Sequence, residues 1–310
     1  MISYTAKRLF GILITLLLLS ILTFALTRLV PGTPWGTNAQ IPLSAEQEAI
    51  FRQRYGMDKP VVEQYLIWLR NAILLDFGRP FTAPELSVTE LIAKALPYSA
   101  IVGGIACLFA LAIGVILGMV AAAARNGWLD NLVTSYAVII AAMPSFVLAY
   151  LLAYFFAAQW RLLPSGGWGG PQHLVLPVIA YGLPVTGGVA RWTRQCLVDT
   201  MSSDYVRTAY AKGLRQAAVI ARHVLRNALI PMITSFLPLF PGMMTGSIFI
   251  EVVFGLPGLG RYFVQSSSNR DYPLVLGITI FWAVLIMLTY FITDVLYGII
   301  DPRVRITERK

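Results

Sequence analysis

The chain has 310 residues, of which 57% are hydrophobic and 13% charged, and its mean hydropathy is +0.70. A soluble domain is typically ~45–50% apolar with about a quarter of its residues charged. This composition excludes a soluble globular protein and indicates a polytopic membrane protein. The 2 cysteines exclude a disulfide scaffold, and the 2 histidines argue against a histidine-rich metal site. The net charge of +9 does not predict nucleic-acid binding here, because membrane proteins collect Lys and Arg in their cytoplasmic loops.

Six apolar stretches are long enough to cross a bilayer core about 30 Å thick, which needs roughly 20 residues per helix. The first follows Lys7 and Arg8 but is longer than a signal-peptide core, so we expect it to be retained. Pro144 is expected to kink the third. Prolines and glycines interrupt the fourth, which predicts a helix surrounded by protein. The six stretches are Leu9–Val30, Tyr98–Ala124, Leu132–Ala158, Leu174–Ala190, Leu229–Val253 and Leu274–Ile300.

The distribution of basic residues predicts that both termini lie in the cytoplasm. An even number of spans puts the two termini on one side of the membrane. More than half of the 24 Lys and Arg residues fall at the N-terminus, in the loops 125–131 and 191–228, and in the C-terminal tail. Acidic residues offset most of the others. Short loops rich in Arg and poor in acids are typical of the cytoplasmic side.

The expected organisation has four parts. Residues 1–30 hold the N-terminus and the first transmembrane helix, and residues 31–97 form an external cap. In the cap, Ser44 and the acids after it predict a helix start. Apolar residues at helical spacing, Tyr65 and Trp68 among them, then predict an amphipathic helix. That helix either packs on the outer ends of the bundle or contacts a soluble partner or substrate. Residues 98–300 form a five-helix core, and 301–310 a tail.

The loop 191–228 contains a predicted short helix at 204–213. Ser203 can cap its start, Asp204 suits the positive end of the helix dipole, and Gly213 can take the left-handed conformation that ends a helix. At 1.5 Å per residue, roughly 9 residues give a helix about 13 Å long, which is too short to span a bilayer. A second basic helix follows and runs into the fifth span. The pattern alone is compatible with docking onto a partner protein and with contact to anionic lipid.

Residues 204–213 (DYVRTAYAKG) and 222–231 (RHVLRNALIP) resemble the cytoplasmic EAA loop of the permeases of binding-protein-dependent ABC importers. They are most similar to the dipeptide and oligopeptide branch. The resemblance extends over nearly the whole chain, and it identifies the chain as similar to the B-type permease subunit. Further motifs that carry it are Arg8-Leu9-Phe10, Tyr55-Gly56-Met57-Asp58-Lys59-Pro60, Asp76-Phe77-Gly78, Leu163–Trp168, Thr245-Gly246-Ser247 with Glu251, Phe254–Gly260, Asn269-Arg270-Asp271-Tyr272 and Asp301-Pro302-Arg303.

The loop departs from the general importer pattern in two ways. Arg207-Thr208-Ala209 stand where the general loop has Glu-Ala-Ala, so contacts specific to that glutamate do not carry over. The I-x-L-P that usually follows the glycine is also absent, and Pro231 comes later. Both departures resemble the variant of the peptide branch.

The resemblance implies an all-α fold like the transmembrane domain of type I ABC importers, in a bacterial plasma membrane. It implies a heterodimer with a second, homologous permease, two cytoplasmic ATPase subunits that bind ATP and Mg²⁺, an external binding protein and a peptide substrate. The short helix would dock in a groove of the ATPase and pass on its motion, with Ala209 permitting close approach. The residues implied in this coupling are Asp204, Tyr205, Arg207, Thr208, Ala209, Lys212 and Gly213.

The chain itself is expected to carry no cofactor, metal or catalytic residue. The phosphate loop G-x-x-x-x-G-K-[ST] is absent from the sequence, so ATP hydrolysis is expected on other chains. Two acids, Glu251 and Asp294, fall inside the spans, where ionisable groups are functional candidates. Each is either a paired structural residue or faces a water-filled path. Candidates for that path are Met243, Thr245, Ser247 and Glu251.

Alternative functions follow from the same features. An ion-coupled secondary carrier would need no ATPase, but the spans contain few embedded charges. An intramembrane hydrolase would need a catalytic set at membrane depth, and His173 and His223 both lie outside the core. Related permeases carry nickel chelates, glutathione or antimicrobial peptides, so these remain alternative substrates.

Overall fold

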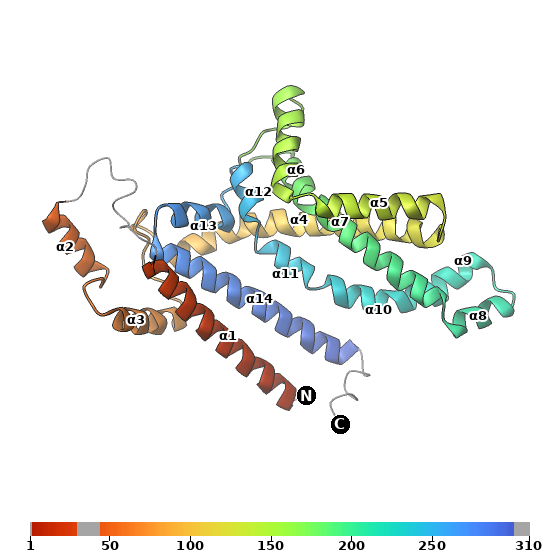
Figure 1. Ribbon diagram of the computed structural model, residues 1–310, viewed down its shortest axis with the longest axis horizontal. Coiled ribbons are helices and arrows are strands. Elements are labelled where there is room, and N and C mark those ends of the chain that lie inside the picture. The colour runs from red at the N-terminus through yellow and green to blue at the C-terminus, as the bar shows by residue number, and fades with distance from the viewer. Residues whose placement is uncertain (1, 30–43, 301–310) are drawn as a thin grey trace. The chain divides into compact units, whose positions relative to one another are not determined.

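The computed structural model describes residues 2–29 and 44–300, and within them the side chains of all residues except 2–5, 216, 217, 221 and 294–300. These residues form α-helices, π-helical segments and turns, with no strand among them (Figure 1). The all-α expectation is therefore confirmed. The end of the first span at Pro31, the role of the Asp294 side chain and the tail 301–310 lie outside the described residues.

The chain divides into two compact units by its contacts. The cap unit comprises residues 1–98 and 257–291, and the core unit comprises residues 99–256 and 292–310. The boundaries differ from those expected, because residues 257–291 group with the N-terminal part of the chain and not with the rest of the expected core. Each unit is described by itself below.

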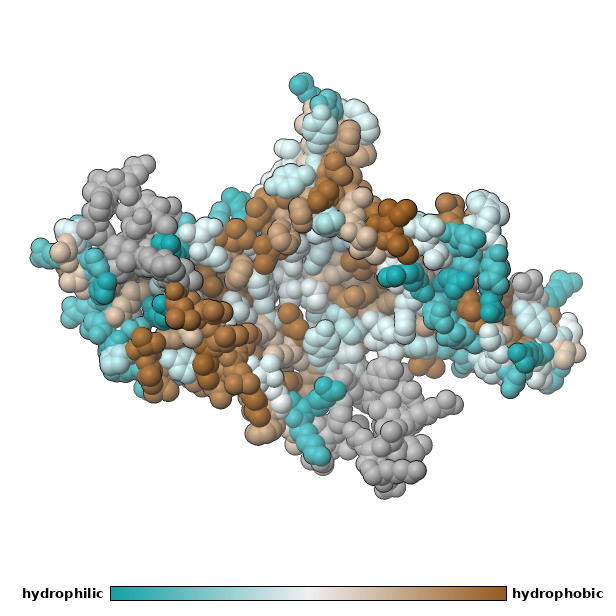
Figure 2. Space-filling view, in the orientation of Figure 1, coloured by the Kyte–Doolittle hydropathy of each residue, from teal (hydrophilic) through white to brown (hydrophobic). Residues whose placement is uncertain are grey.

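Five helices of the described chain are long and apolar enough to cross a membrane, and a bent pair makes a sixth if it counts as one span. This agrees with the six expected stretches. Apolar side chains remain exposed along the first helix, for example Leu13 and Leu18, and they form a hydrophobic surface in Figure 2. The five helices are Ala6–Leu29, Val88–Ala123, Gln172–Met201, Arg222–Val253 and Tyr272–Thr293.

The third expected span is broken at Pro144. Helix α5 (Trp128–Ala142) and the segment that follows it, α6 (Ser145–Leu152) with the π-helix η1 (Ala153–Gln159), meet at an angle of 95°. Met143 has an extended backbone, which is the conformation that a following proline favours. The expected kink is confirmed, and it is sharp enough to divide the helix.

The cap unit begins with α1 (Ile2–Leu29) and continues through α2 (Ala45–Arg54) and α3 (Val61–Ile73). Ser44 starts α2 with a complete capping box: its Oγ accepts from the Gln47 N–H at 3.3 Å, and the Gln47 side chain accepts from the Ser44 N–H at 2.9 Å. The predicted helix start is thus confirmed. The unit also contains the first turns of α4 (Val88–Ala123), α13 (Leu259–Ser268) and most of α14 (Tyr272–Ile300).

Helix α3 packs one face against α1. The Tyr65 hydroxyl lies 2.8 Å from Ser20 Oγ, and the Tyr65 and Phe24 rings meet edge to face with centroids 5.4 Å apart. The amphipathic helix predicted from the cap sequence therefore packs on its own chain through its aromatic side. Its other side stays exposed, with Leu66, Ile73 and Leu74 among the uncovered residues.

Asp271 joins two distant segments of the cap unit. Its carboxylate is fully buried and accepts hydrogen bonds from the Thr82 N–H at 2.9 Å, from Thr82 Oγ1 at 2.7 Å and from the Leu274 N–H at 3.4 Å. The third bond caps the start of α14. An apolar cluster that includes Val88, Leu259 and Ile278 completes this core.

In the core unit, α7 (Gln172–Met201) packs closely against α4 and α5. Half of its apolar window is buried, which is the largest share among the five long helices. Gly114 and Gly118 on α4 touch α7, and Gly187 on α7 touches α5, so tightly that a Cβ at any of the three would overlap the neighbouring helix. Small residues at such contacts let membrane helices approach. The predicted protein-enclosed helix is confirmed, although it extends to Met201, beyond its expected end.

The fifth span is a chain of short helices. Helix α9 (Gln216–Val219) continues through the π-helix η2 (Ile220–Val224), which contains Arg222, into α10 (Leu225–Phe236), which contains Arg226. Helices α11 (Leu239–Met244) and α12 (Ile248–Val253) follow. The expected basic helix that enters the fifth span is therefore present. Between α11 and α12 the chain turns at Gly246, whose φ of +93° is open to glycine at little cost.

We predict that Asp271→Ala destabilises the cap unit by about 2–4 kcal/mol, because it removes the buried carboxylate that holds Thr82 and caps the start of α14. Thermal unfolding of the purified chain and amide exchange at residues 80–84 measure this change. Asp58→Ala, which removes an exposed carboxylate of the same unit, is the control. Equal stability of the two variants would contradict the assignment.

Candidate functional site

The predicted short cytoplasmic helix is present as α8 (Asp204–Ala211). Asp204 lies in its first turn, as expected for the positive end of a helix dipole. The expected Ser203 side-chain cap is not formed. Ser203 has the extended backbone of a residue that precedes a helix, but its hydroxyl donates backward to the Thr200 carbonyl at 2.5 Å, at the end of α7. The serine therefore fixes the turn between the two helices.

Gly213 closes α8 in the way its sequence predicts. Its φ is +76°, its N–H donates to the Tyr210 carbonyl at 2.9 Å, and the Leu214 N–H donates to the Ala209 carbonyl at 3.4 Å. This pair of bonds is the Schellman motif, which satisfies carbonyls that the helix end leaves without partners. Helix α8 is thus a closed, two-turn unit between two defined turns.

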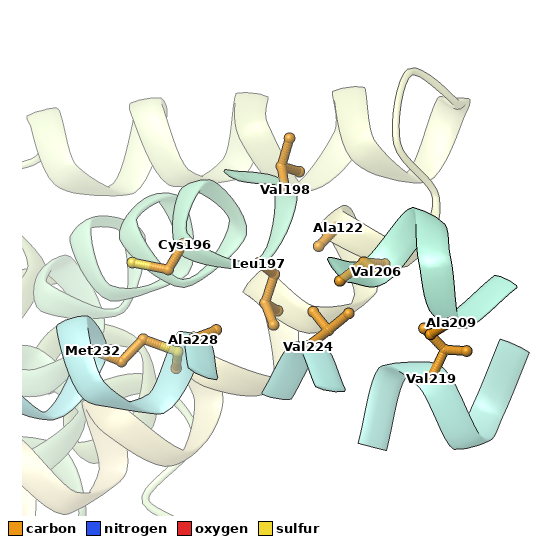
Figure 3. Packing of buried hydrophobic residues seen from close by; sticks show 10 residues of the cluster. All are labelled: Ala122, Cys196, Leu197, Val198, Val206, Ala209, Val219, Val224, Ala228 and Met232. Carbon is orange, nitrogen blue, oxygen red and sulfur yellow. The ribbon is translucent and has the colours of Figure 1, made fainter. Parts of the chain in front are cut away.

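One face of α8 is attached to the chain's own helices. Val206 is fully buried and Ala209 is 5% exposed, and both belong to an apolar cluster with residues of α4, α7 and the α9–α10 run. Figure 3 shows Val206 near Ala122 of α4 and Ala209 beside Val219 of α9. The expectation that Ala209 permits close approach of another chain is therefore corrected. Its small side chain lets α8 lie close to its own bundle.

The opposite face of α8 is exposed and carries aromatic and charged groups. Tyr205 is 45% exposed and Tyr210 is 43% exposed. The Asp204 carboxylate and the Arg207 guanidinium lie 3.6 Å apart at the surface, which is a weak pair in water. Figure 2 shows this end of the core unit as a hydrophilic surface. Of the coupling residues predicted from the sequence, all except Ala209 are exposed: Asp204, Tyr205, Arg207, Thr208, Lys212 and Gly213.

A buried ion pair fixes the helices that lead to this site. The carboxylate of Asp130, at the start of α5, accepts two hydrogen bonds from Arg194 on α7, at 2.5 Å and 2.6 Å. It also accepts from the Asn126 N–H at 2.9 Å, and the residue is only 3% exposed. A forked pair of this kind restrains both distance and orientation. The sequence analysis missed it, although an acid at the start of a span and an arginine near the end of another are visible signals.

Glu251 is a paired structural residue in this structure, so the water-filled alternative does not hold for this conformation. It is 2% exposed, and its Oε1 accepts from Ser99 Oγ of α4 at 2.7 Å. Gly246 lies so near that a Cβ there would overlap the glutamate oxygen. Tyr181 of α7 donates toward the Gly246 carbonyl at 3.4 Å. Four segments of the core unit therefore meet around one carboxylate.

The other candidate path residues also turn toward their own chain. Met243 and Thr245 are buried. The Thr245 hydroxyl donates to the Gly242 carbonyl at 2.7 Å. The Ser247 hydroxyl oxygen caps α12 by accepting from the Ile250 N–H at 3.4 Å. The large side chains that this segment exposes are Met244, Phe249 and Val252.

Metal ligands do not gather in the part of the chain that the structure describes. Its His, Cys, Asp and Glu residues form no group of three or more that could hold an ion. Both cysteines, Cys107 and Cys196, are buried and free.

We predict that Gly213→Ala frays the end of α8, because a Cβ at this positive φ costs about 1 kcal/mol. Amide exchange of the peptide covering residues 209–214 should accelerate roughly fivefold, since exchange follows the local opening free energy. Gly170→Ala, at a glycine with open space and no positive φ, is the control. Unchanged exchange in the first variant would contradict the role given to Gly213.

We also predict that Gly246→Ala destabilises the core unit by roughly 2 kcal/mol or more, through backbone strain and overlap with Glu251. Gly242→Ala, four residues earlier and facing open space, should change the thermal midpoint little. If the two alanine variants unfold at the same temperature, the carboxylate at Glu251 does not organise this turn.

Comparisons with known proteins agree with this arrangement. The family described as binding-protein-dependent transport system inner membrane component matches residues 114–306, and its N-terminal family matches residues 1–95. The dipeptide transport system permease protein DppB of Bacillus subtilis is 38% identical over 100% of both chains. The oligopeptide transport system permease protein OppB of Haemophilus influenzae is 40% identical over 98% of this chain and 100% of the relative.

Two solved structures share the fold at lower identity. One shows inward facing conformations of the MetNI methionine ABC transporter, with a TM-score of 0.54 and 17% identity over 68% of this chain and 96% of the other. The second is an amino acid ABC transporter with histidines, with a TM-score of 0.53 and 19% identity over 68% and 94%. The expected fold class is confirmed. This chain belongs to the family of inner membrane components of binding-protein-dependent transport systems.

Proposed function

We propose that this chain is the pore-forming permease subunit of an importer of dipeptides or oligopeptides, driven by ATP hydrolysis on partner ATPase subunits. The observation that carries the proposal is the two-faced attachment of α8. Val206 and Ala209 hold one face against the chain's own helices, while Tyr205 and Tyr210 leave the other face open for a partner. Tyrosine is enriched among the residues that dominate protein interfaces.

The apolar cluster beneath α8 connects this helix to the helices that would cross the membrane. It contains Ala122 near the end of α4, Leu197 on α7, and Val224 and Met232 on the run that enters the fifth span. Burying a valine contributes about 1.5–3 kcal/mol, so several such contacts resist separation of α8 from the helices below it. A partner that moves α8 would therefore move these helix ends with it.

The presence of one proposed docking helix per chain supports a set of partners. One chain offers one docking helix, so two ATPase subunits call for a second permease. We infer a heterodimer with a homologous permease, with an external binding protein that delivers the substrate. The ATPases would supply ATP and Mg²⁺ binding.

The peptide substrate is supported by the relatives. Dipeptide and oligopeptide permeases from several bacteria are 36–40% identical to this chain over 98–100% of its length. We infer that both termini lie in the cytoplasm of a bacterial cell, because α8 and the basic residues around it must face the ATPase. A nickel chelate or glutathione as cargo would leave the coupling argument unchanged.

We predict that replacing Tyr205 and Tyr210 together by alanine lowers ATP-driven uptake of a labelled peptide at least tenfold. Each aromatic truncation at an interface centre costs at least about 1–2 kcal/mol. The measurement is uptake by proteoliposomes that contain the assembled transporter, its binding protein and internal ATP. Co-purification of the ATPase subunits should fall in parallel.

The matched control is the pair Tyr205→Phe and Tyr210→Phe, which keeps both rings and should retain most of the uptake. Thermal unfolding should be unchanged in both double variants, because the two side chains are largely exposed. Full uptake by the alanine variant would reject docking through α8. Peptide accumulation on a proton gradient without ATP would reject the importer function itself and indicate a carrier.

A further inference from the structure

The cap unit contains a cavity of about 450 Å³ that the proposed transport function does not use. It lies between the end of α1, the end of α2, one side of α3 and the start of α14. Phe24, Arg28, Gln64, Trp68 and Tyr272 are among its lining residues. Because α1 is a candidate membrane span and Arg28 is in its last turn, the cavity lies at the level of the membrane–water interface.

Three residues that line this cavity each carry a buried polar atom without a hydrogen-bond partner among the residues that the structure describes. These atoms are Arg28 Nε, Gln64 Oε1 and Trp68 Nε1. Leaving such an atom unpaired costs about 1–3 kcal/mol, so native proteins normally satisfy it with a neighbour, water or a ligand. Only one other side-chain atom of the described chain, Thr193 Oγ1, is in the same situation. The concentration of three in one cavity indicates a binding site.

The surrounding contacts hold these atoms in defined orientations. The Arg28 guanidinium lies over the Phe24 ring at 5.1 Å and over the Tyr272 ring at 5.3 Å. The Trp68 ring packs on the same Phe24 ring, with the two centroids 6.0 Å apart. Gln64 Nε2 donates to the Lys59 carbonyl at 2.7 Å, which leaves its oxygen as an acceptor without a partner among the described residues. The site thus offers two donors, one of them cationic, and one acceptor.

The charges around the cavity favour an anion. Arg28, Arg54 and Lys59 line it, together with the carboxylate of Asp76. Because Lys59 is paired with Glu63 at 2.8 Å, the excess of positive charge rests on the two arginines. Burial, the largest effect, raises the pKa of the Tyr55 hydroxyl at the cavity wall, so this group adds no negative charge at neutral pH. A guanidinium and an indole N–H among the lining residues of one cavity match the oxygens of a phosphate or carboxylate.

A second cavity of about 370 Å³ lies beside the first in the same unit, and Tyr272 lines both. Its walls are largely apolar and include Leu26, Phe263 and Val275. Leu26 is on α1, so this cavity opens on a helix whose outward side chains suit a bilayer. An anionic ligand with an apolar tail would match the two cavities together.

We propose that the cap unit binds an acidic phospholipid, with its phosphate at Arg28 and Trp68, a headgroup hydroxyl at Gln64 and an acyl chain along α1 at the second cavity. The chemistry is that of a basic pocket between membrane helices, which suits lipid headgroups. A bound lipid would tie α2 and α3 to α1 and α14. A free peptide carboxylate meets the same donors but makes no use of the apolar cavity.

The test is native mass spectrometry of the assembled transporter in mild detergent, exchanged into mixed micelles that contain phosphatidylglycerol. We expect one retained lipid per copy of this chain, and little retention of phosphatidylcholine with the same acyl chains. Arg28→Gln should lower the retained fraction about tenfold, and Trp68→Phe, which removes the indole N–H but keeps an aromatic ring, about threefold, in line with bonds to a charged group. Arg70→Gln, an exposed charge of α3 outside the cavity, should retain lipid like the wild type.

Several results would overturn the proposal. Equal retention in Arg28→Gln and Arg70→Gln would mean that the lipid binds elsewhere. Release of the lipid by excess inorganic phosphate would indicate a simple anion site, and release by a dipeptide would indicate a substrate site. If Arg28→Gln fails to fold, the Trp68→Phe variant decides alone, because it keeps an aromatic ring against Phe24, and unchanged retention in it rejects the site. None of these results depends on whether the transporter carries peptides.

Discussion

The attachment of α8 to its own bundle is the constraint on which the rest of the account depends. Val206 and Ala209 bury the inner face of a two-turn helix against the ends of α4, α7 and the α9–α10 run. A helix this short is not stable alone in water, so its tertiary contacts and its closed ends maintain it. Ser203 defines the turn before it, and the Schellman motif at Gly213 defines the turn after it. The exposed face can receive a partner because the inner face is already bound.

The helices under α8 are themselves restrained by contacts of two kinds. Small residues let α4 and α5 approach α7 so closely that a single added methyl at Gly114 or Gly187 would not fit. Buried polar links then fix orientation: Asp130 at the start of α5 bonds to Arg194 on α7, and Glu251 on α12 bonds to Ser99 on α4. Such links are costly unless each partner is satisfied, which makes their geometry specific. The helices under α8 are therefore tightly packed, and a displacement of α8 would be passed on to them.

Much of this arrangement could be predicted from the sequence. The apolar stretches, the proline break at Pro144 and the glycine end of α8 depend on local chemistry, and each was predicted correctly. What could not be predicted is which side of a residue faces a neighbour. Ala209 was assigned to the partner face and Glu251 was considered for an open path, whereas both turn inward. These orientations are set by residues distant in sequence, such as Val219 and Ser99, whose proximity no local pattern encodes.

The most direct test of the central claim is a distance measured within the core unit during ATP turnover. Spin labels would be placed at Thr208 on α8 and at Arg191 on α7, both exposed, in a chain whose two native cysteines are replaced. Pulsed electron resonance would then record the distance with the assembled transporter resting and with ATP trapped. We expect one narrow distribution, unchanged between the two states, because α8 and α7 move together. A distance that shifts or broadens when ATP binds would show that α8 moves apart from the bundle, and would contradict the account.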